Sequence, residues 1–352
     1  MGLKQNTWSL DQWYGQIVAG NVSYSGQGAL YTWGDNEVGG LGNSSKTNLS
    51  SPIQVPGTTW PKDGKLFSAG YQGGTAIKTD GTLWAWGYNS YGQLGLNDGT
   101  QYSSPKQVPG TTWATVTAGQ EYTMATKTDG TLWAWGRNNF GQLGSTDTGS
   151  YYSSPIQIPG STWKTDVQLG SHANAAMAVK TDGTLWGWGR NDVGNLAQDN
   201  RTDYSSPRQV PGTTWSHCVK TMKWGAGAIK TDGTLWMWGS NTYGQLGLNN
   251  RTYYSSPVQI PGTTWSYCAT NEGSGLAMKT DGTIWVWGAN GGGVLGQNQP
   301  YTIKYSSPVQ VPGTWSDCNI GLKTMFATKP DGTLWGWGSN GTGELGQNEI
   351  IN

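Results

Sequence analysis

The sequence has few of the residues on which catalysis, metal binding or charge-driven recognition depend. Its 352 residues include two His and three Cys, and 21 Lys and Arg balance 21 Asp and Glu to give a net charge of zero. A nucleic-acid ligand requires an excess of cations facing the phosphates. No apolar run approaches the ~20 residues of a membrane span, and no secretory signal is visible near Met1. We therefore expect neither a nucleic-acid partner nor a membrane span.

The three cysteines occupy one recurring position. Cys218, Cys268 and Cys318 are spaced 50 residues apart, and each lies three residues after a Trp. Equivalent positions in successive repeats point in equivalent directions, whereas a disulfide needs Cα atoms within about 7 Å of each other. We expect small, buried, reduced side chains rather than a disulfide or a three-Cys metal site.

Glycine and tryptophan, by contrast, are abundant, with 56 and 22 residues, and both recur with a fixed period. The pattern L-W-x-W-G, with LYTWG and IWVWG as variants, ends at Gly34, Gly87, Gly136, Gly189, Gly239, Gly288 and Gly338. The second Trp of successive copies is separated by 53, 49, 53, 50, 49 and 50 residues. A second marker, S-S-P-x-Q-[VI]-P-G, occurs six times and leads to a third Trp. Self-similarity at this period indicates a repeat architecture.

One unit, residues 113–159, predicts four strands. After a first β-branched strand, a second covers 123–128, and Asp129-Gly130 predicts a hairpin turn in which both residues take positive φ. The third strand, TLWAWG, is apolar on both faces, as expected for a sheet packed between neighbouring sheets. Leu143 in the next loop is expected to pack into this unit. Proline cannot donate to the ladder, so the S-S-P strand is expected at the outer edge.

Seven such units predict an all-β fold, a seven-bladed β-propeller of four-stranded antiparallel blades, with residues 1–352 as a single domain. There are seven L-W-x-W-G strands but six S-S-P strands. A terminus is therefore expected to supply the missing outer strand, from either residues 2–9 or residues 349–352. This pairing of the two ends in one blade would close the ring and remove its exposed edges. No segment shows the 3.6-residue period of a helix.

The loop after the W-G strand is similar to that of a known family. The pattern G-x-N-x-x-G-Q-L-G appears as GYNSYGQLG at 87–95, GRNNFGQLG at 136–144 and GSNTYGQLG at 239–247, nearly intact as GSNGTGELG at 338–346, and in weaker form at 189–197 and in the first unit. It resembles the regulator of chromosome condensation repeat family, whose members form seven-bladed propellers. Regular units of this kind look like the uniform members found in bacteria and their phages.

The best-known activity of that family is guanine-nucleotide exchange on a small GTPase, together with chromatin binding. The resemblance implies that exchange depends on a protruding β-wedge insertion and on charged loops. Here the spacing stays within 49–53 residues, which leaves no room for a wedge, and Tyr122 stands about where the family's usual His would be. Exchange activity is therefore not carried over, since a shared fold does not imply a shared function.

Candidate catalytic and metal-binding groups are sparse. His172 and His217 do not recur between units, and we expect both to be structural. The T-D-G turns, with P-D-G in the last unit, carry one acidic residue each, at Asp80, Asp129, Asp182, Asp232, Asp281 and Asp331. We expect these carboxylates to accept hydrogen bonds within their turns rather than to bind a metal. No phosphate loop, zinc spacing or EF-hand spacing is present. The sequence therefore predicts no catalytic residue, no cofactor and no metal, and a protein that is not an enzyme.

The candidate binding surface lies at the start of the outer strand. A Tyr precedes each of five S-S-P markers, at Tyr102, Tyr152, Tyr204, Tyr254 and Tyr305. The polar segments before them differ most between units, and we select Asn97, Asp199 and Asn249 from these segments. Variable loops on a rigid scaffold are where recognition residues concentrate. The alternative is that the Tyr rings cover the outer edge of the sheet.

These observations favour a non-catalytic interaction or structural module on a virion or extracellular surface, in a tail-fibre, decoration or receptor-binding role. Its partners would be proteins of a larger assembly, or a surface glycan or receptor. Two alternatives stay open. One is a cytoplasmic propeller regulator that binds a protein such as a small GTPase, and the other is a lectin-like carbohydrate binder.

Overall fold

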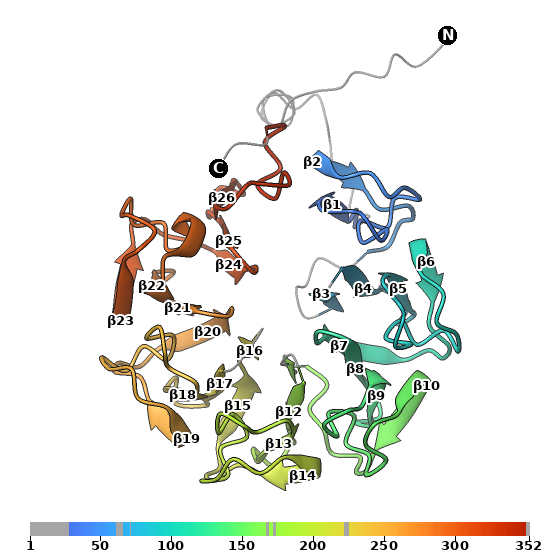
Figure 1. Ribbon diagram of the computed structural model, residues 1–352, viewed down its shortest axis with the longest axis horizontal. Coiled ribbons are helices and arrows are strands. Elements are labelled where there is room, and N and C mark those ends of the chain that lie inside the picture. The colour runs from blue at the N-terminus through green and yellow to red at the C-terminus, as the bar shows by residue number, and fades with distance from the viewer. Residues whose placement is uncertain are drawn as a thin grey trace.

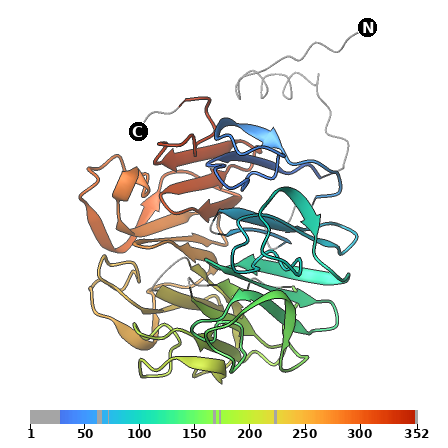
Figure 2. The ribbon, with the colours of Figure 1, turned by 45° about the vertical axis from the view of Figure 1, so that its right-hand side comes forward.

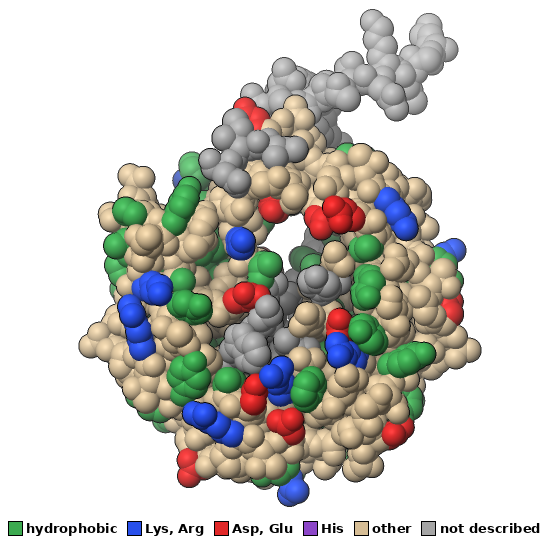
Figure 3. All heavy atoms as spheres, in the orientation of Figure 1, with side chains coloured by type: hydrophobic (Ala, Val, Ile, Leu, Met, Phe, Trp, Pro, Cys, Tyr) green, Lys and Arg blue, Asp and Glu red, His purple; other side chains and the backbone are tan. Residues whose placement is uncertain are grey.

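The computed structural model describes residues 28–60, 66–70, 72–166, 169–171, 174–221 and 225–349. These residues form seven sheets, arranged as blades around a central opening (Figures 1 and 3). In Figure 2 the blades follow one another in chain order, from blue to red. The prediction of an all-β, seven-bladed propeller is confirmed. The described residues contain no α-helix, and their helical structure is limited to short segments such as the 3₁₀ turn η2 (Gly291–Gly293). No helical segment among them is long and apolar enough to cross a bilayer.

Within a blade, antiparallel strands follow one another in chain order from the centre to the rim (Figure 1). Blade 1 contains β1 (Tyr31–Gly34) and β2 (Leu49–Gln54); blade 2 contains β3 (Phe67–Gly70), β4 (Gly73–Ile77), β5 (Leu83–Gly87) and β6 (Tyr102–Gln107); blade 3 contains β7 (Trp113–Ala118), β8 (Tyr122–Lys127), β9 (Leu132–Arg137) and β10 (Tyr151–Ile158). Blade 4 contains β11 (Gly170–Ser171), β12 (Ala175–Val179), β13 (Leu185–Gly189) and β14 (Tyr204–Gln209); blade 5 contains β15 (Trp215–Cys218), β17 (Gly225–Lys230), β18 (Leu235–Gly239) and β19 (Tyr254–Gln259). Blade 6 contains β20 (Trp265–Thr270), β21 (Ser274–Lys279), β22 (Ile284–Ala289) and β23 (Lys304–Val311), joined by the parallel β16 (Lys220–Thr221); blade 7 contains β24 (Asp317–Ile320), β25 (Thr324–Thr328) and β26 (Leu334–Gly338).

Blade 3 matches the strands that the sequence predicts, but its hairpin turn differs. Its strand order is β10-β9-β8-β7, with the proline-bearing β10 outermost. Gly130 has φ +80°, whereas Asp129 is not among the residues with positive φ, so the prediction of positive φ at both is wrong. The Gly130 N–H donates to the Lys127 carbonyl (3.0 Å), and the Lys127 N–H donates to the Thr131 carbonyl (2.9 Å). This is a three-residue loop, in which the left-handed conformation falls on the glycine alone.

The core lies between the blades as well as within them. Leu143 is buried, as expected, and packs with Leu132 and Ile158 of blade 3 against Trp163 and Trp188 of blade 4. Each junction also has an indole N–H that donates to a loop carbonyl of the preceding blade, at 2.7–3.0 Å. The donor and acceptor residues are Trp86 and Gly40, Trp135 and Gln93, Trp188 and Gln142, Trp238 and Asn195, Trp287 and Gln245, Trp337 and Val294, and Trp33 and Glu344. The second Trp of L-W-x-W-G is therefore an interblade anchor.

Blades 7 and 1 make the same kind of junction contacts as other neighbours. Besides the Trp33 bond, the Asn348 N–H donates to the Ser50 carbonyl at 2.8 Å. Among the described residues, β26 has no strand on its outer side, and its Leu334 is 49% exposed, whereas the equivalent Leu132 is 0% exposed. Glu349 is described but is not in a strand, and residues 2–9 and 350–352 lie outside the described residues. The closing strand therefore stays a prediction.

Candidate functional site

A buried Asn shapes the loop that follows each W-G strand. In blade 2 the Asn89 Oδ1 accepts from the Leu94 N–H (2.9 Å), and its Nδ2 donates to the Thr100 carbonyl (2.9 Å). The same bond from the N–H five residues on is made to Asn36, Asn89, Asn138, Asn191, Asn241, Asn290 and Asn340. Buried polar groups need such partners. The Asn of G-x-N therefore has a structural role, and it fixes seven loops in one shape.

The five predicted Tyr residues are half-buried at the start of the outer strands. The hydroxyls of two of these tyrosines donate to an Asp of the same loop. Tyr102 donates to Asp98 (2.9 Å), and Tyr152 donates to Asp147 (3.0 Å). Those of Tyr204 and Tyr254 accept from the amides of Asn200 (3.1 Å) and Asn250 (3.0 Å), and Tyr305 packs against the core between blades 6 and 7. Four of the hydroxyls therefore bond within their own loops and Tyr305 packs at a blade junction, and recognition by these residues stays a prediction.

Asn97, Asp199 and Asn249 are exposed at the rim and have positive φ of 63°, 56° and 58°. Their N–H groups donate to the first Ser of the next blade's S-S-P strand, at the carbonyls of Ser153, Ser255 and Ser306, over 2.7–2.9 Å. Their side-chain oxygens accept from the second Ser, at Ser154 (3.0 Å), Ser256 (3.2 Å) and Ser307 (3.1 Å). The two serines of the S-S-P strand therefore bond to a loop residue of the preceding blade and link the two blades. This role was not predicted from the sequence.

The Asp of each T-D-G turn is bound within its turn, as expected. Asp129 Oδ1 accepts from both the N–H (3.0 Å) and the hydroxyl (2.7 Å) of Thr131, and these bonds lower the pKa of the carboxyl. The same Thr hydroxyl accepts from the indole N–H of Trp133 at 2.9 Å. Within the described residues, no group of three or more His, Cys, Asp or Glu side chains is placed to hold a metal ion.

The Lys of the K-T-D-G sequence, which is K-P-D-G in blade 7, lies between two Trp rings in six blades, a feature that was not predicted from the sequence. The ammonium groups lie 4.1–5.8 Å from the ring centroids. The six are Lys78, Lys127, Lys180, Lys230, Lys279 and Lys329. Such cation–π contacts hold the charge against the blade edge.

The described His and Cys side chains are largely buried, and they do not form a cluster that could act as a nucleophile. The Nδ1 of His217 lies 3.1 Å from the neighbouring Ser216 hydroxyl, and burial together with the Lys164 charge lowers the pKa of His217. His172 lies outside the described residues. Cys218, Cys268 and Cys318 are free and buried, which confirms the prediction of buried, reduced thiols, and burial raises the pKa of Cys218 to about 12. A buried neutral thiol is a poor nucleophile.

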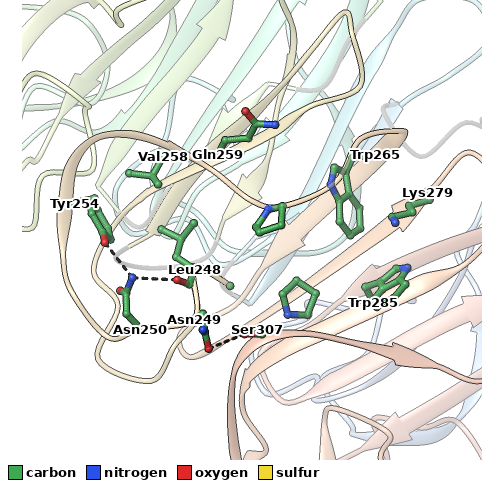
Figure 4. Close-up of a pocket in the computed structure, with 13 residues that line it drawn as sticks. Leu248, Asn249, Asn250, Tyr254, Val258, Gln259, Trp265, Lys279, Trp285 and Ser307 are labelled. Carbon is green, nitrogen blue, oxygen red and sulfur yellow. Dashed lines mark hydrogen bonds between the residues drawn. The ribbon is translucent and has the colours of Figure 1, made fainter.

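A groove of about 430 Å³ lies at the rim between blades 5 and 6. It contains two of the predicted residues, Asn249 and Tyr254. Figure 4 shows Leu248 and Val258 on one side, with Lys279 and Trp285 on the other. Of the described residues that line the groove, Lys279 is the only charged one. The groove therefore combines apolar walls with a fixed cation, as ligand sites commonly do.

The face in Figure 3 has basic and acidic side chains interspersed around the central opening. The seven sheets and their repeated interblade contacts define the fold as a repeat propeller. The profile of the "Regulator of chromosome condensation (RCC1) repeat" matches residues 27–62, 80–126, 129–177, 182–227 and 232–268, more than half of the chain, and a second profile of that description matches 65–93 and 113–142. The chain belongs to the regulator of chromosome condensation repeat family.

A curated protein has a similar sequence, and two solved structures have a similar fold. The "Ultraviolet-B receptor UVR8" of Arabidopsis thaliana is 27% identical over 201 residues, which are 55% of this chain and 45% of the receptor. The chain spans less than half the length of the curated relatives that it matches. Human WBSCR16 has a similar fold (TM-score 0.77, 20% identity, 92% of this chain and 93% of that chain). So has Prp20p from Saccharomyces cerevisiae (TM-score 0.79, 20% identity, 92% and 84%), whose structure was described with its binding properties to Gsp1p and histones.

Proposed function

We propose that this chain is a non-catalytic, protein-binding propeller of the intracellular regulator type. The observation that supports the proposal is that the recurring and the variable residues of the repeat have different surroundings. Recurring Asn, Trp, Ser and Asp side chains are engaged in holding the blades, whereas the groove between blades 5 and 6 and the variable loop residues beside it face solvent. Rigid scaffolds that display variable loops are suited to recognition.

Family membership supports protein recognition. The binding of Prp20p to Gsp1p and histones is a property of that protein, and it makes a protein partner, including a small GTPase, the first class to test here. The relatives support this regulator role better than the virion-surface role that the composition favours. Carbohydrate binding and a place on a virion or cell surface are the competing proposals.

Site-specific photo-crosslinking tests the proposed function. A benzophenone amino acid would replace Arg251, which is exposed in the variable loop of blade 5. The matched control replaces Thr231, which is exposed at the T-D-G turn of the same blade. In cells that naturally express the protein, we expect one dominant protein adduct at Arg251 and none at Thr231, identified by mass spectrometry and reproduced with the purified partner.

Three results would contradict the proposal. Equal adducts at both positions would indicate non-specific contact. Recovery of the chain in purified virions would restore the virion role. Faster release of labelled nucleotide from a purified GTPase partner would show that the chain catalyses exchange rather than binding alone.

A further inference from the structure

We propose that the groove between blades 5 and 6 binds an extended peptide segment in which an acidic side chain pairs with Lys279 and an aliphatic side chain packs on Leu248 and Val258. This inference rests on the proposed protein-binding function and names the site and the chemistry of the partner.

At position 248 the groove differs from its equivalents in blades 4 and 6. In blade 4 the equivalent residue, Gln198, donates its amide to the Gln209 carbonyl (2.9 Å), and in blade 6 Gln297 donates to the Gln310 carbonyl (3.3 Å). These bonds bridge the loop to the outer strand. Leu248 has no amide with which to make the bridge, so its side chain is left as an apolar wall of the groove (Figure 4).

Blade 5 alone combines this Leu with an aliphatic residue after the S-S-P proline, since blade 2 has Leu96 at the position of Leu248 but Lys106 at that of Val258. Lys106 and Arg208 hold the position of Val258 in blades 2 and 4, and their charges lie 5.3 and 5.0 Å from the ring centroids of Tyr102 and Tyr204. Val258 places no cation over the ring of Tyr254, and both residues line the groove. An aliphatic side chain of a ligand would bury apolar area against this surface.

The charge in the groove selects an acidic ligand. The Lys279 ammonium lies 4.9 Å from the centroids of both Trp265 and Trp285, and among the described residues it forms no ion pair. The nearby Asp281 carboxylate is bonded to the Thr283 hydroxyl at 2.7 Å. Because Lys279 already lies over the Trp285 ring, the flat face that a sugar would stack on is occupied. A carboxylate, by contrast, would meet a pre-positioned, partly desolvated cation.

The backbone of the outer strand supplies the remaining recognition. Gln259 lies opposite Trp236, and the next residue, Ile260, donates its N–H to the Leu235 carbonyl (2.8 Å). Hydrogen-bonded and non-bonded pairs alternate along an antiparallel ladder, so the Gln259 N–H and carbonyl point away from β18. In blade 4 the equivalent carbonyl is the one that Gln198 occupies. At Gln259 it is therefore placed to accept an N–H from an extended peptide.

Fluorescence anisotropy with the full chain tests the inference. The probe is a set of fluorescein-labelled decapeptides in which a central Glu is flanked by Val, Ile or Pro, together with the same set carrying Gln in place of Glu. We expect the best Glu peptide to bind about fivefold or more tightly than its Gln counterpart, as loss of a partly desolvated ion pair predicts. Leu248→Gln, which copies the bridge of blades 4 and 6, is expected to weaken binding about tenfold.

Gln198→Leu is the matched control, because it opens the neighbouring groove and leaves this one intact. We expect it to retain peptide binding, and both variants to keep the wild-type melting temperature. Equal binding by wild type and Leu248→Gln, or no binding by any peptide, would overturn the inference. An Arg251 adduct would then still support the proposed function, so the two failures are distinguishable. Binding of labelled oligosaccharides that Leu248→Gln abolishes, without peptide binding, would assign the groove to carbohydrate.

Discussion

Asn89 and its six equivalents show how a single side chain can set the shape of a loop. Each is buried, accepts a backbone N–H five residues on, and donates to carbonyls of the same loop. At this scale, recurring residues have internal partners and differing residues face the rim. The combination of Leu248 with Val258 belongs to the second group, since Leu96 of blade 2 is combined with Lys106 and Val309 of blade 6 with Gln297. The sequence shows that blade 4 has Gln198 and Arg208 at these two positions. The structural effect of the difference follows only from the contacts that Gln198 and Arg208 make in the folded chain.

Replacing the loop Asn tests its structural role. Asn89→Ala removes the acceptor for Leu94 and the donor to Thr100, and leaves buried polar groups unpaired. We expect a loss of about 1–3 kcal/mol in the free energy of unfolding, measured by urea denaturation. Ser90→Ala, at the exposed neighbouring position, is the control and should stay within about 0.5 kcal/mol of wild type. Equal effects of the two substitutions would contradict the role.

At the scale of elements, the hairpin between the second and third strands recurs with one geometry and serves two purposes. Its Asp and Thr complete the turn, and its Lys is held between two Trp rings. The glycine of the turn also approaches the next blade. A Cβ at Gly130 would meet the Ser161 carbonyl oxygen at 2.5 Å, whereas the nearest atom to a Cβ at Gly81, in the equivalent turn, is the Thr112 nitrogen at 3.4 Å.

This difference gives a matched pair of substitutions. Both glycines have positive φ, +80° and +78°, so alanine at either site should cost about 1–2 kcal/mol from backbone conformation alone. Gly130→Ala should cost a further ~1–3 kcal/mol, because the turn must move away from blade 4. Thermal unfolding of the two variants measures the difference, and a Gly81→Ala protein as unstable as Gly130→Ala would show that the junction is unimportant.

For the whole molecule, the open question is the outer neighbour of β26. Leu334 and Trp335 are 49% and 50% exposed, whereas equivalent leucines in complete blades are buried. Asn348 already links blade 7 to blade 1 through Ser50 and Ser51. A deletion that tests the closing strand must therefore leave Asn348 in place.

Two deletions separate the candidates for the closing strand. Removing residues 2–9 tests the N-terminal version, and removing 350–352 tests the C-terminal version. We expect one deletion to lower the stability by about 2 kcal/mol or more, because the strand that covers a Leu and a Trp is lost, and the other to leave the melting temperature unchanged. No change with either deletion would refute closure by strand pairing.

The number of blades, the order of strands in blade 3, the outer place of the S-S-P strand and the burial of the cysteines could all be predicted from the amino-acid sequence. Each follows from local periodicity or from the chemistry of one residue type, which the repeats display between three and seven times. Only the folded chain shows that the serines bond to the preceding blade, that the lysines lie between Trp rings, and that Leu248 and Val258 line one groove. The serine contacts join residues 57 and 58 positions apart in adjacent blades, and the sequence spacing does not say which atoms meet there.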